Sequence, residues 1–276
     1  MASYSPEQNN SIVLEAFETL FNKRDYHAAE KFWSPDYIQH SAHIPPGRDG
    51  LFNLVRAAPP SLHYDNSLIF AQDDLVMLHG RFSGNGRSHN WVAADILIMK
   101  NGVLIEHWDV LQDEATRAES LSARPMFGSS FPEPVAGAPL TPEQARTIVA
   151  PLYDALNQPA KKDVVALLAR ATNPDYQSYS TNDDCLNRNQ LADVFKKIGA
   201  AVPDLRWSIK DILVSGDQIV VRGEATGTPE RELFGAKPTG RSFKTMSIDV
   251  FTVKGEKLAS AYHVENWVGA LQQLSK

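Results

Sequence analysis

The fold is decided by two matching stretches of sequence, SPEQNNSIVLEAFETLFN (residues 5–22) and TPEQARTIVAPLYDALNQ (residues 141–158). Each begins with a hydroxyl residue, Ser5 or Thr141, followed by proline and then, three positions after the hydroxyl residue, by glutamine. This is a capping-box pattern, in which the hydroxyl and the glutamine side chain satisfy backbone N–H groups at a helix start. Apolar residues then recur at helical spacing, so each stretch is predicted to form a helix with one buried face.

The match continues through five further pairs of segments in the same order, which indicates an internal duplication. The second copy also carries an extra loop, TPERELFGAKPTGR (residues 228–241), between its middle strands. The matching pairs are SPDYIQH (34–40) with NPDYQSY (173–179), RDGLFNLV (48–55) with RNQLADVF (188–195), LHY (62–64) with LRW (205–207), DDLVMLHGRFSG (73–84) with GDQIVVRGEATG (216–227), and ADILIMKNGVLIEHWDV (94–110) with IDVFTVKGEKLASAYHV (248–264).

The chain of 276 residues is long enough for two ordinary domains. We expect domains at residues 1–115 and 140–276, joined by a linker at 116–139 that is rich in Pro, Gly, Ala and Ser. Each copy is predicted to run helix, helix, short strand, helix and then alternating strands, which is an α+β order. A sheet of this kind can curve around its helices and leave an apolar cavity.

Composition narrows the class of protein. The formal charge of −6 argues against a nucleic-acid-binding protein, which would show a basic face. One cysteine, Cys185, excludes an intrachain disulfide, and its polar surroundings offer no His to activate it as a nucleophile. With no secretory signal and no apolar run near the ~20 residues that span a bilayer, we expect a cytoplasmic protein without membrane contact.

At specific motifs the copies resemble known families. The first, with YIQHSAHIPPGRDG (37–50) and IEHWDVLQ (105–112), resembles SnoaL-like proteins described as aldol-condensation enzymes. The second, with VPDLRWSIKDILVSGDQIVVRGEATGT (202–228), FGAKPTGR (234–241) and YHVENW (262–267), resembles SnoaL-like ester cyclases. The chain thus looks like tandem SnoaL-like polyketide cyclase domains of the nuclear-transport-factor-2-like superfamily.

The resemblance implies two cone-shaped α+β barrels, each with three helices on a curved antiparallel sheet and an interior pocket. It implies sheet-to-sheet pairing, here as an intrachain pseudo-dimer or a homodimer. It also implies no cofactor, because cyclase relatives close a polyketide ring by intramolecular aldol addition with a pocket acid/base and no metal. Hydrolases, dehydratases, isomerases and non-catalytic binders use the same scaffold, so fold alone does not select the reaction.

Polar side chains converge on one face of the last two strands of the first copy. Trp91, Asp95 and Met99 alternate on one strand, and Val103, His107 and Asp109 lie on the matching face of the next. If the hairpin pairs Met99 with Val103, then Asp95 lies opposite His107 and Asp109 is one diagonal step away. A histidine between two carboxylates on an apolar face suits general acid–base catalysis, and the resemblance places the family's catalytic Asp near Asp109. The structural alternative is an Asp–His hydrogen bond that only orients the strands.

Substrate-binding residues are expected at the pocket mouth and walls. A metal site built from His40, His43, His107 and Asp109 is the alternative use of these histidines, but their spacing matches no ligand motif, and no metal is expected. The candidates in the first copy are Tyr37, His40, His43, Trp91 and Trp108.

The second copy departs from this pattern. Asp249 aligns with Asp95, but His263 stands in place of Asp109 and Ala261 in place of His107. Asp249 and His263 could still form an acid/base pair on one face. Tyr176 is a candidate binding residue, and Arg222 is either a pocket residue, which would fit an epoxide-hydrolase-like site, or part of a surface ion pair.

These observations favour a cofactor-independent enzyme of the cyclase, isomerase or lyase type that acts on a small apolar carbonyl or polyketide-like compound. Asp109 or His107 would move a proton, and pocket donors would stabilise the enolate oxygen. The alternative is a non-catalytic carrier for a small apolar metabolite. A protein–protein scaffold is a third class, but it would not need polar groups on the pocket faces.

Overall fold

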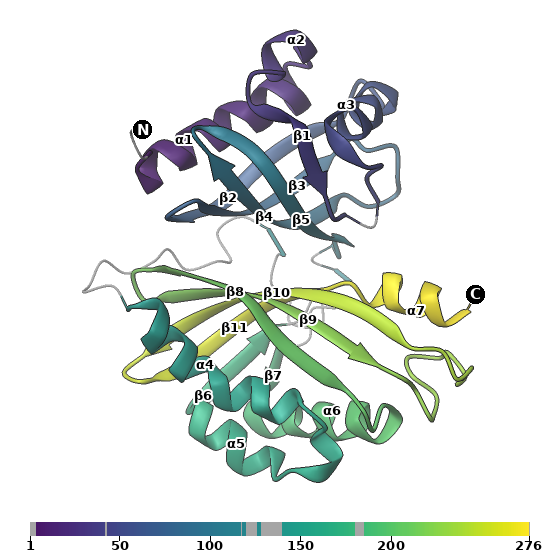
Figure 1. The fold of residues 1–276 in the computed structure, drawn as a ribbon. Helices are drawn as coiled ribbons and strands as arrows, with labels where there is room; N and C mark the ends of the chain where they lie inside the picture. Colours follow the sequence, from purple (N-terminus) through teal and green to yellow (C-terminus); the bar gives the residue numbers. More distant parts are fainter. Residues whose placement is uncertain are drawn as a thin grey trace. The chain divides into compact units, whose positions relative to one another are not determined.

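The computed structural model describes residues 4–41, 43–116, 118–119, 126–127, 140–179 and 185–275. The chain divides into two compact units, Met1–Glu133 and Pro134–Lys276 (Figure 1). Most of the expected linker at 116–139 lies outside the described residues, so its assignment stays a prediction, as does the pairing of the two copies. Within the described part of the chain, no helix is long and apolar enough to cross a membrane.

The first unit contains a five-stranded sheet with the order β1-β5-β4-β3-β2. Its elements are α1 (Pro6–Phe17), a π-helical turn η1 (Glu18–Asn22), α2 (Tyr26–Ala29), β1 (Trp33–Gln39), α3 (Gly47–Ala57), β2 (His63–Gln72), β3 (Leu75–Ser83), β4 (Trp91–Lys100) and β5 (Val103–Asp113).

The second unit repeats this order as β6-β11-β10-β9-β8, with the short β7 added beside β6. A closing helix, α7, was not expected from the sequence. The elements are α4 (Pro142–Leu156), η2 (Pro159–Lys161), α5 (Val164–Ala171), β6 (Thr172–Tyr179), β7 (Cys185–Asn187), α6 (Arg188–Ala201), β8 (Arg206–Ser215), β9 (Gln218–Gly227), β10 (Phe243–Lys254), β11 (Lys257–Glu265) and α7 (Trp267–Ser275).

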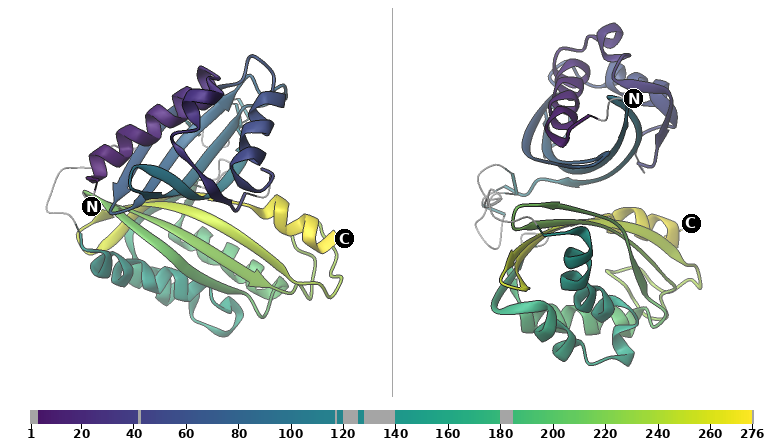
Figure 2. Two further views of the ribbon diagram at one scale, coloured as in Figure 1. Left: turned by 45° about the horizontal axis from the view of Figure 1, so that its top comes forward. Right: turned by 60° about the vertical axis from the view of Figure 1, so that its left-hand side comes forward.

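The α+β architecture of two tandem domains is confirmed, with one refinement of the sheet. Four strands of each unit form the expected antiparallel meander, but β1 and β6 run parallel to β5 and β11, so each sheet is mixed. In each unit the sheet curls around its first helix, α1 or α4 (Figure 2). The buried faces of these helices, with Val13 and Phe17 in one and Tyr153 and Leu156 in the other, pack into the core on the concave side.

Both expected capping boxes are present. Ser5 accepts a hydrogen bond from Gln8 N–H and Thr141 one from Gln144 N–H, and each glutamine side chain bonds back to the capping residue's backbone. We expect Thr141→Ala to lower the free energy of unfolding of the second unit by about 1 kcal/mol, because Gln144 N–H at the start of the helix loses the hydroxyl that accepts its hydrogen bond. Denaturant unfolding of this variant, compared with Thr141→Ser, which keeps the hydroxyl, checks the result; equal losses in both variants would contradict it.

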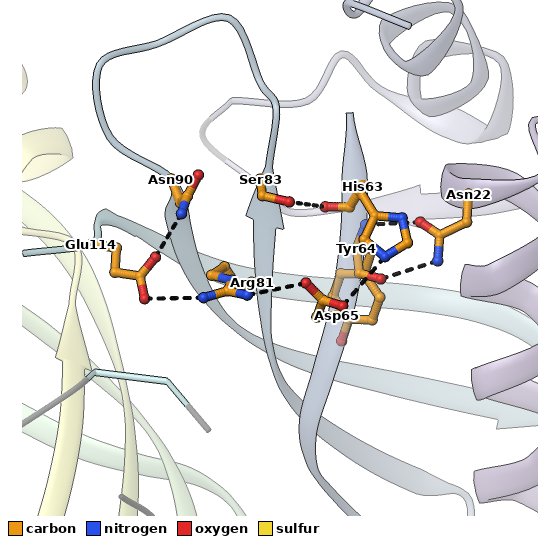
Figure 3. Close-up of polar contacts among 8 residues, drawn as sticks. All are labelled: Asn22, His63, Tyr64, Asp65, Arg81, Ser83, Asn90 and Glu114. Atoms are coloured by element: carbon orange, nitrogen blue, oxygen red, sulfur yellow. Dashed lines mark hydrogen bonds and ion pairs between the residues drawn. The ribbon is translucent and has the colours of Figure 1, made fainter. Parts of the chain in front are cut away.

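A π-helical turn at the end of α1 shifts the two repeats by one residue. The Asn22 side chain donates to Tyr64 O at 3.0 Å and accepts from Tyr64 N at 2.8 Å (Figure 3). In the second unit Asn157 makes the same two bonds to Trp207. An ungapped alignment instead pairs Asn157 with Phe21, so the extra residue of the π turn restores the equivalence. These two hydrogen bonds fix the first helix of each unit against the edge strand, β2 or β8, on the concave side of the sheet.

Candidate functional site

The concave side of the first sheet encloses a cavity of about 260 Å³. Its walls are mostly aromatic and aliphatic, and its two carboxylates and one of its two histidines lie on β4 and β5. The lining residues are Phe17, Phe21, Trp33, Tyr37, His43, Ile44, Leu51, Leu54, Val55, Ala57, Ala58, Pro59, Leu62, Phe82, Asn85, Trp91, Asp95, His107, Asp109 and Leu111.

Asp95, His107 and Asp109 converge at this cavity, all at most 5% exposed. Their pairing differs from the expected register. Asp95 lies opposite Asp109, and His107 opposite Leu97. Two one-residue shifts cause this: the hairpin pairs Lys100 rather than Met99 with Val103, and β5 bulges between the pairs Ile98–Glu106 and Met99–Leu104. The expected Asp95–His107 contact still forms diagonally, with His107 Nε2 and Asp95 Oδ1 2.8 Å apart.

Gln39, on β1, holds the other side of the histidine ring, and the sequence analysis missed it. Its Oε1 lies 3.0 Å from His107 Nδ1 and also accepts the Ser41 backbone N–H at 2.9 Å. Strand alternation from Tyr37 was the available signal, because Gln39 shares that residue's inward face. Since both ring nitrogens face acceptor oxygens, the arrangement favours the doubly protonated ring, which donates to both.

The electrostatics of the cluster follow from burial and proximity. Burial alone lowers the pKa of His107, but the hydrogen bond to Asp95 and the charges of both carboxylates outweigh it, so the pKa is raised. Burial raises the pKa of Asp109, with the Asp95 charge adding to it and His107 opposing it. Asp95 Oδ2 and Asp109 Oδ1 are buried and have no hydrogen-bond partner among the described residues.

The same three residues could hold a divalent cation, because one ligand atom from each lies within 4.8 Å of the others. In this geometry His107 Nε2 instead bonds Asp95. His40, part of the metal set considered from sequence, is not among them: its Nε2 lies 2.7 Å from Glu106, and its ring stacks on Trp108 at 4.5 Å.

Three of the expected binding residues of the first copy, Tyr37, His43 and Trp91, line the cavity. His40 and Trp108 do not, contrary to expectation. Strand alternation explains both cases. His40 follows the inward residue Gln39, and Trp108 lies between the inward residues His107 and Asp109 on β5, so both point away from the cavity.

The corresponding cavity of the second unit measures only about 30 Å³. Asp249 lies opposite His263, as expected, but its Oδ2 accepts hydrogen bonds from the Tyr153 hydroxyl at 2.6 Å and from Ser247 at 2.9 Å. His263 Nδ1 lies 3.5 Å from Glu265. Asp249, which aligns with Asp95, therefore already has hydrogen-bond partners within the protein, whereas Asp95 Oδ2 has none among the described residues.

Larger side chains fill this second cavity. Four residues that line it are each bulkier than the residue at the aligned position of the first copy. Tyr176, an expected binding residue, lies on the wall of this small space. The pairs, first copy to second, are Ala16 to Leu152, Val55 to Phe195, Tyr64 to Trp207 and Leu97 to Phe251.

Arg222, expected as a possible pocket residue, does not line this cavity. Its guanidinium bonds Asp211 at 2.5 Å, while Glu224 pairs with Lys210 and Lys244. The inward residues of β9 are Val221 and its alternating neighbours, so Arg222 belongs to the opposite face. An ion pair fits this placement, but Arg222 is buried rather than on the surface, and its partner is Asp211 in place of Glu224.

The buried Asp249 should make the second unit's stability depend on pH. Burial raises its pKa from 3.8 to about 6, against the opposing effects of His263 and Tyr153. The folded state therefore holds this proton more tightly than the unfolded chain, and stability is lost as the pH rises from about 4 through 6. We expect Asp249→Asn to stabilise the protein at pH 7 by about 2 kcal/mol and to have little effect at pH 4. Calorimetry across pH 4–8 checks this; a gain that is constant with pH would contradict it.

Solved structures that are similar to this chain each cover about half of it. A search of curated proteins finds no match. Among solved structures, IdmH from Streptomyces antibioticus, titled a proposed polyketide cyclase, is 25% identical, with 48% of this chain and 99% of that chain covered and a TM-score of 0.43. A proposed SnoaL-like polyketide cyclase from Jannaschia sp. CCS1 is 18% identical, with 50% and 98% covered and a TM-score of 0.45.

The family model described as SnoaL-like polyketide cyclase matches the chain twice, at residues 11–119 and 150–274. Each match coincides with one copy of the repeat and one unit of the fold. The chain therefore belongs to the SnoaL-like polyketide cyclase family, as a tandem of two such domains.

Proposed function

We propose that the first unit is a cofactor-independent enzyme of the cyclase or isomerase type, which moves a proton next to a carbonyl group of a small apolar compound. The observation that carries the proposal is the buried Asp95–His107–Asp109 cluster at the wall of the 260 Å³ cavity. Family membership supports a cyclase- or isomerase-type role. The second unit is proposed to be non-catalytic, since its cavity is filled and Asp249 already has protein partners.

Asp109 is proposed as the general base. Its Oδ1 has no hydrogen-bond partner among the described residues, so it can accept a proton from the α-carbon of a ligand in the cavity. Burial makes this carboxylate more basic than a solvated one, which brings its pKa closer to working pH. The positive charge of His107, held by Asp95 and Gln39, lies beside the enolate as it forms and stabilises its negative charge.

Tyr37 is proposed to donate a hydrogen bond to the substrate oxygen. It lines the cavity, and burial raises the pKa of its hydroxyl well above the usual value, so the hydroxyl keeps its proton at neutral pH. This proton can be donated to the oxygen of a ligand in the cavity. Transfer of the α-proton to Asp109, carbon–carbon bond formation or double-bond shift, and return of the proton complete a balanced cycle without a redox step.

Deuterium exchange tests the proposal without knowledge of the natural substrate. A panel of one- and two-ring ketones is incubated in D2O with the protein, and α-proton loss is followed by NMR. We expect exchange well above the buffer rate for ketones that bind, with the rate falling as the pH drops through the raised pKa of Asp109. Ketones that bind tightly yet exchange no faster than in buffer would instead favour a carrier of small apolar metabolites.

A further inference from the structure

The charged groups around the first unit's cavity restrict which ligands can enter it. Among its described lining residues none is lysine or arginine, and the histidine and carboxylate side chains are His43, Asp95, His107 and Asp109. The charge of His107 offsets one carboxylate, to which it is hydrogen-bonded at 2.8 Å. A carboxylate or phosphate group on a ligand would therefore meet a second carboxylate, with His43 as the one other described lining side chain able to carry a positive charge, in surroundings where unpaired charge is costly.

Two unsatisfied atoms of the cavity wall are carboxylate acceptors, Asp95 Oδ2 and Asp109 Oδ1, and one is a donor, Trp33 Nε1. Asp95 uses Oδ1 for His107, and its Oδ2 is buried without a partner among the described residues. Asn85, another polar lining residue, is engaged within its own loop, since its side chain bonds His89 O and Arg87 N. A buried acceptor left unmatched is destabilising, so a ligand that brings a hydroxyl hydrogen to Asp95 removes that cost.

The volume of the cavity limits the size of the apolar part of the ligand. An apolar cavity of about 150 Å³ accommodates a benzene molecule, so the 260 Å³ found here leaves room for a second fused ring. Aromatic side chains such as Phe17, Phe21 and Trp33 supply flat walls. The exposed side chain of Leu54 makes the mouth apolar as well.

We propose that the first unit's cavity takes an uncharged ligand of about two fused rings that presents a hydroxyl or enol O–H group to Asp95. The proposal rests on the proposed function, in which the same ligand exposes its carbonyl oxygen to Tyr37 and its α-proton to Asp109. The substrate class is then a hydroxy ketone or its enol, rather than a simple ketone or a carboxylic acid. A reaction that supplies this substrate must leave a free hydroxyl near the carbonyl group.

Calorimetric titration with a matched naphthalene series tests the ligand class on the full chain. The probes are 1-naphthol, 1-methylnaphthalene, 1-naphthaldehyde, 1-naphthoate and 1-naphthylmethylammonium, which share one skeleton and differ in the polar group. We expect 1-naphthol to bind at least about tenfold more tightly than 1-methylnaphthalene, and 1-naphthoate at least about tenfold more weakly. Equal affinities for naphthol and methylnaphthalene, or tightest binding of the naphthoate or the ammonium compound, would overturn the proposal.

A substitution of Asp95, whose Oδ2 is proposed to accept the ligand hydroxyl, tests the proposal further. In Asp95→Asn the amide N–H group replaces an acceptor oxygen, so the preference for 1-naphthol should fall by about tenfold while that for 1-naphthaldehyde rises. Asp36→Asn, an exposed carboxylate on β1 of the same unit, is the matched control and should leave the series unchanged. An unaltered order of affinities in Asp95→Asn, with its fold confirmed by circular dichroism, would show that Asp95 does not read the hydroxyl.

The two proposals can fail separately. The naphthalene series measures binding only, so its expected order can hold even if no ketone exchanges deuterium. Conversely, exchange that depends on Asp109 together with tightest binding of an anion or a cation would remove the inferred ligand class and leave the proposed catalysis in place.

Discussion

Asp109→Asn should lower the turnover of the protein by about 10²–10⁴ while ligand affinity stays close to that of the unchanged protein. Asparagine keeps the shape of the side chain, but its amide cannot accept the proton that the proposed reaction removes. The site is 5% exposed, so water cannot readily take over the role of the base. Deuterium exchange and calorimetric titration on the same preparation give the two quantities separately.

The same substitution in the second unit tests which copy acts. Asp249 accepts hydrogen bonds from Tyr153 and Ser247 and borders a cavity of only about 30 Å³, so Asp249→Asn should leave turnover unchanged. Asp36→Asn serves as a surface control. A loss of turnover in Asp249→Asn as large as in Asp109→Asn would contradict the assignment of activity to the first unit. A loss of affinity in Asp109→Asn, without a change in exchange rate per bound ligand, would favour a carrier.

Local signals in the sequence were enough to predict most of the fold. The capping boxes at Ser5 and Thr141 depend only on residues within one helical turn, and both form as expected. Strand alternation likewise placed Asp95, His107 and Asp109 on one face, and the structure brings all three to the cavity. The periodicity that assigns a face is a property of the single strand, so it does not depend on neighbours.

Features that depend on a single inserted residue could not be predicted in this way. The bulge in β5, together with a one-residue shift at the hairpin, made Asp109 rather than His107 the partner of Asp95. The π turn that ends at Asn22 moved the helix-to-strand bond by one position. Each involves an extra residue that the pattern of apolar positions hardly changes. Tyr37 and His43 line the cavity as expected, but His40 does not, because it alternates away from Tyr37. Gln39, which faces the site, was missed because glutamine is not typical of acid–base sites.

The sizes of the cavities could not be predicted from either copy alone. A cavity volume is a small difference between the space enclosed by the backbone and the summed volumes of many side chains, which in most protein interiors fill that space almost completely. The aligned copies nevertheless show which positions matter, because several lining residues are larger in the second. One of these, Val55 in the first copy and Phe195 in the second, lines its cavity in both units.

Val55→Phe should therefore remove the binding capacity of the first unit. Val55 is 1% exposed on α3 and faces the cavity, so the added ring has open space to occupy and little reason to unfold the helix. We expect ligand affinity and turnover to fall by about 10², since even one methylene group in a tight apolar pocket changes discrimination by roughly 10–200-fold. Titration with 1-naphthol and the deuterium exchange assay give the two losses.

Graded filling distinguishes occlusion from general damage. Val55→Ile adds one methylene group and should weaken binding by much less than the phenylalanine, while the free energy of unfolding stays within about 1.5 kcal/mol in both variants, because an open cavity accepts the extra atoms with little strain. If Val55→Phe lowers the free energy of unfolding by clearly more than about 1.5 kcal/mol, the cavity is not open at this position. If it folds normally and binds and turns over ligand as before, the proposed site does not lie in this cavity, and the cluster of Asp95, His107 and Asp109 serves the fold alone.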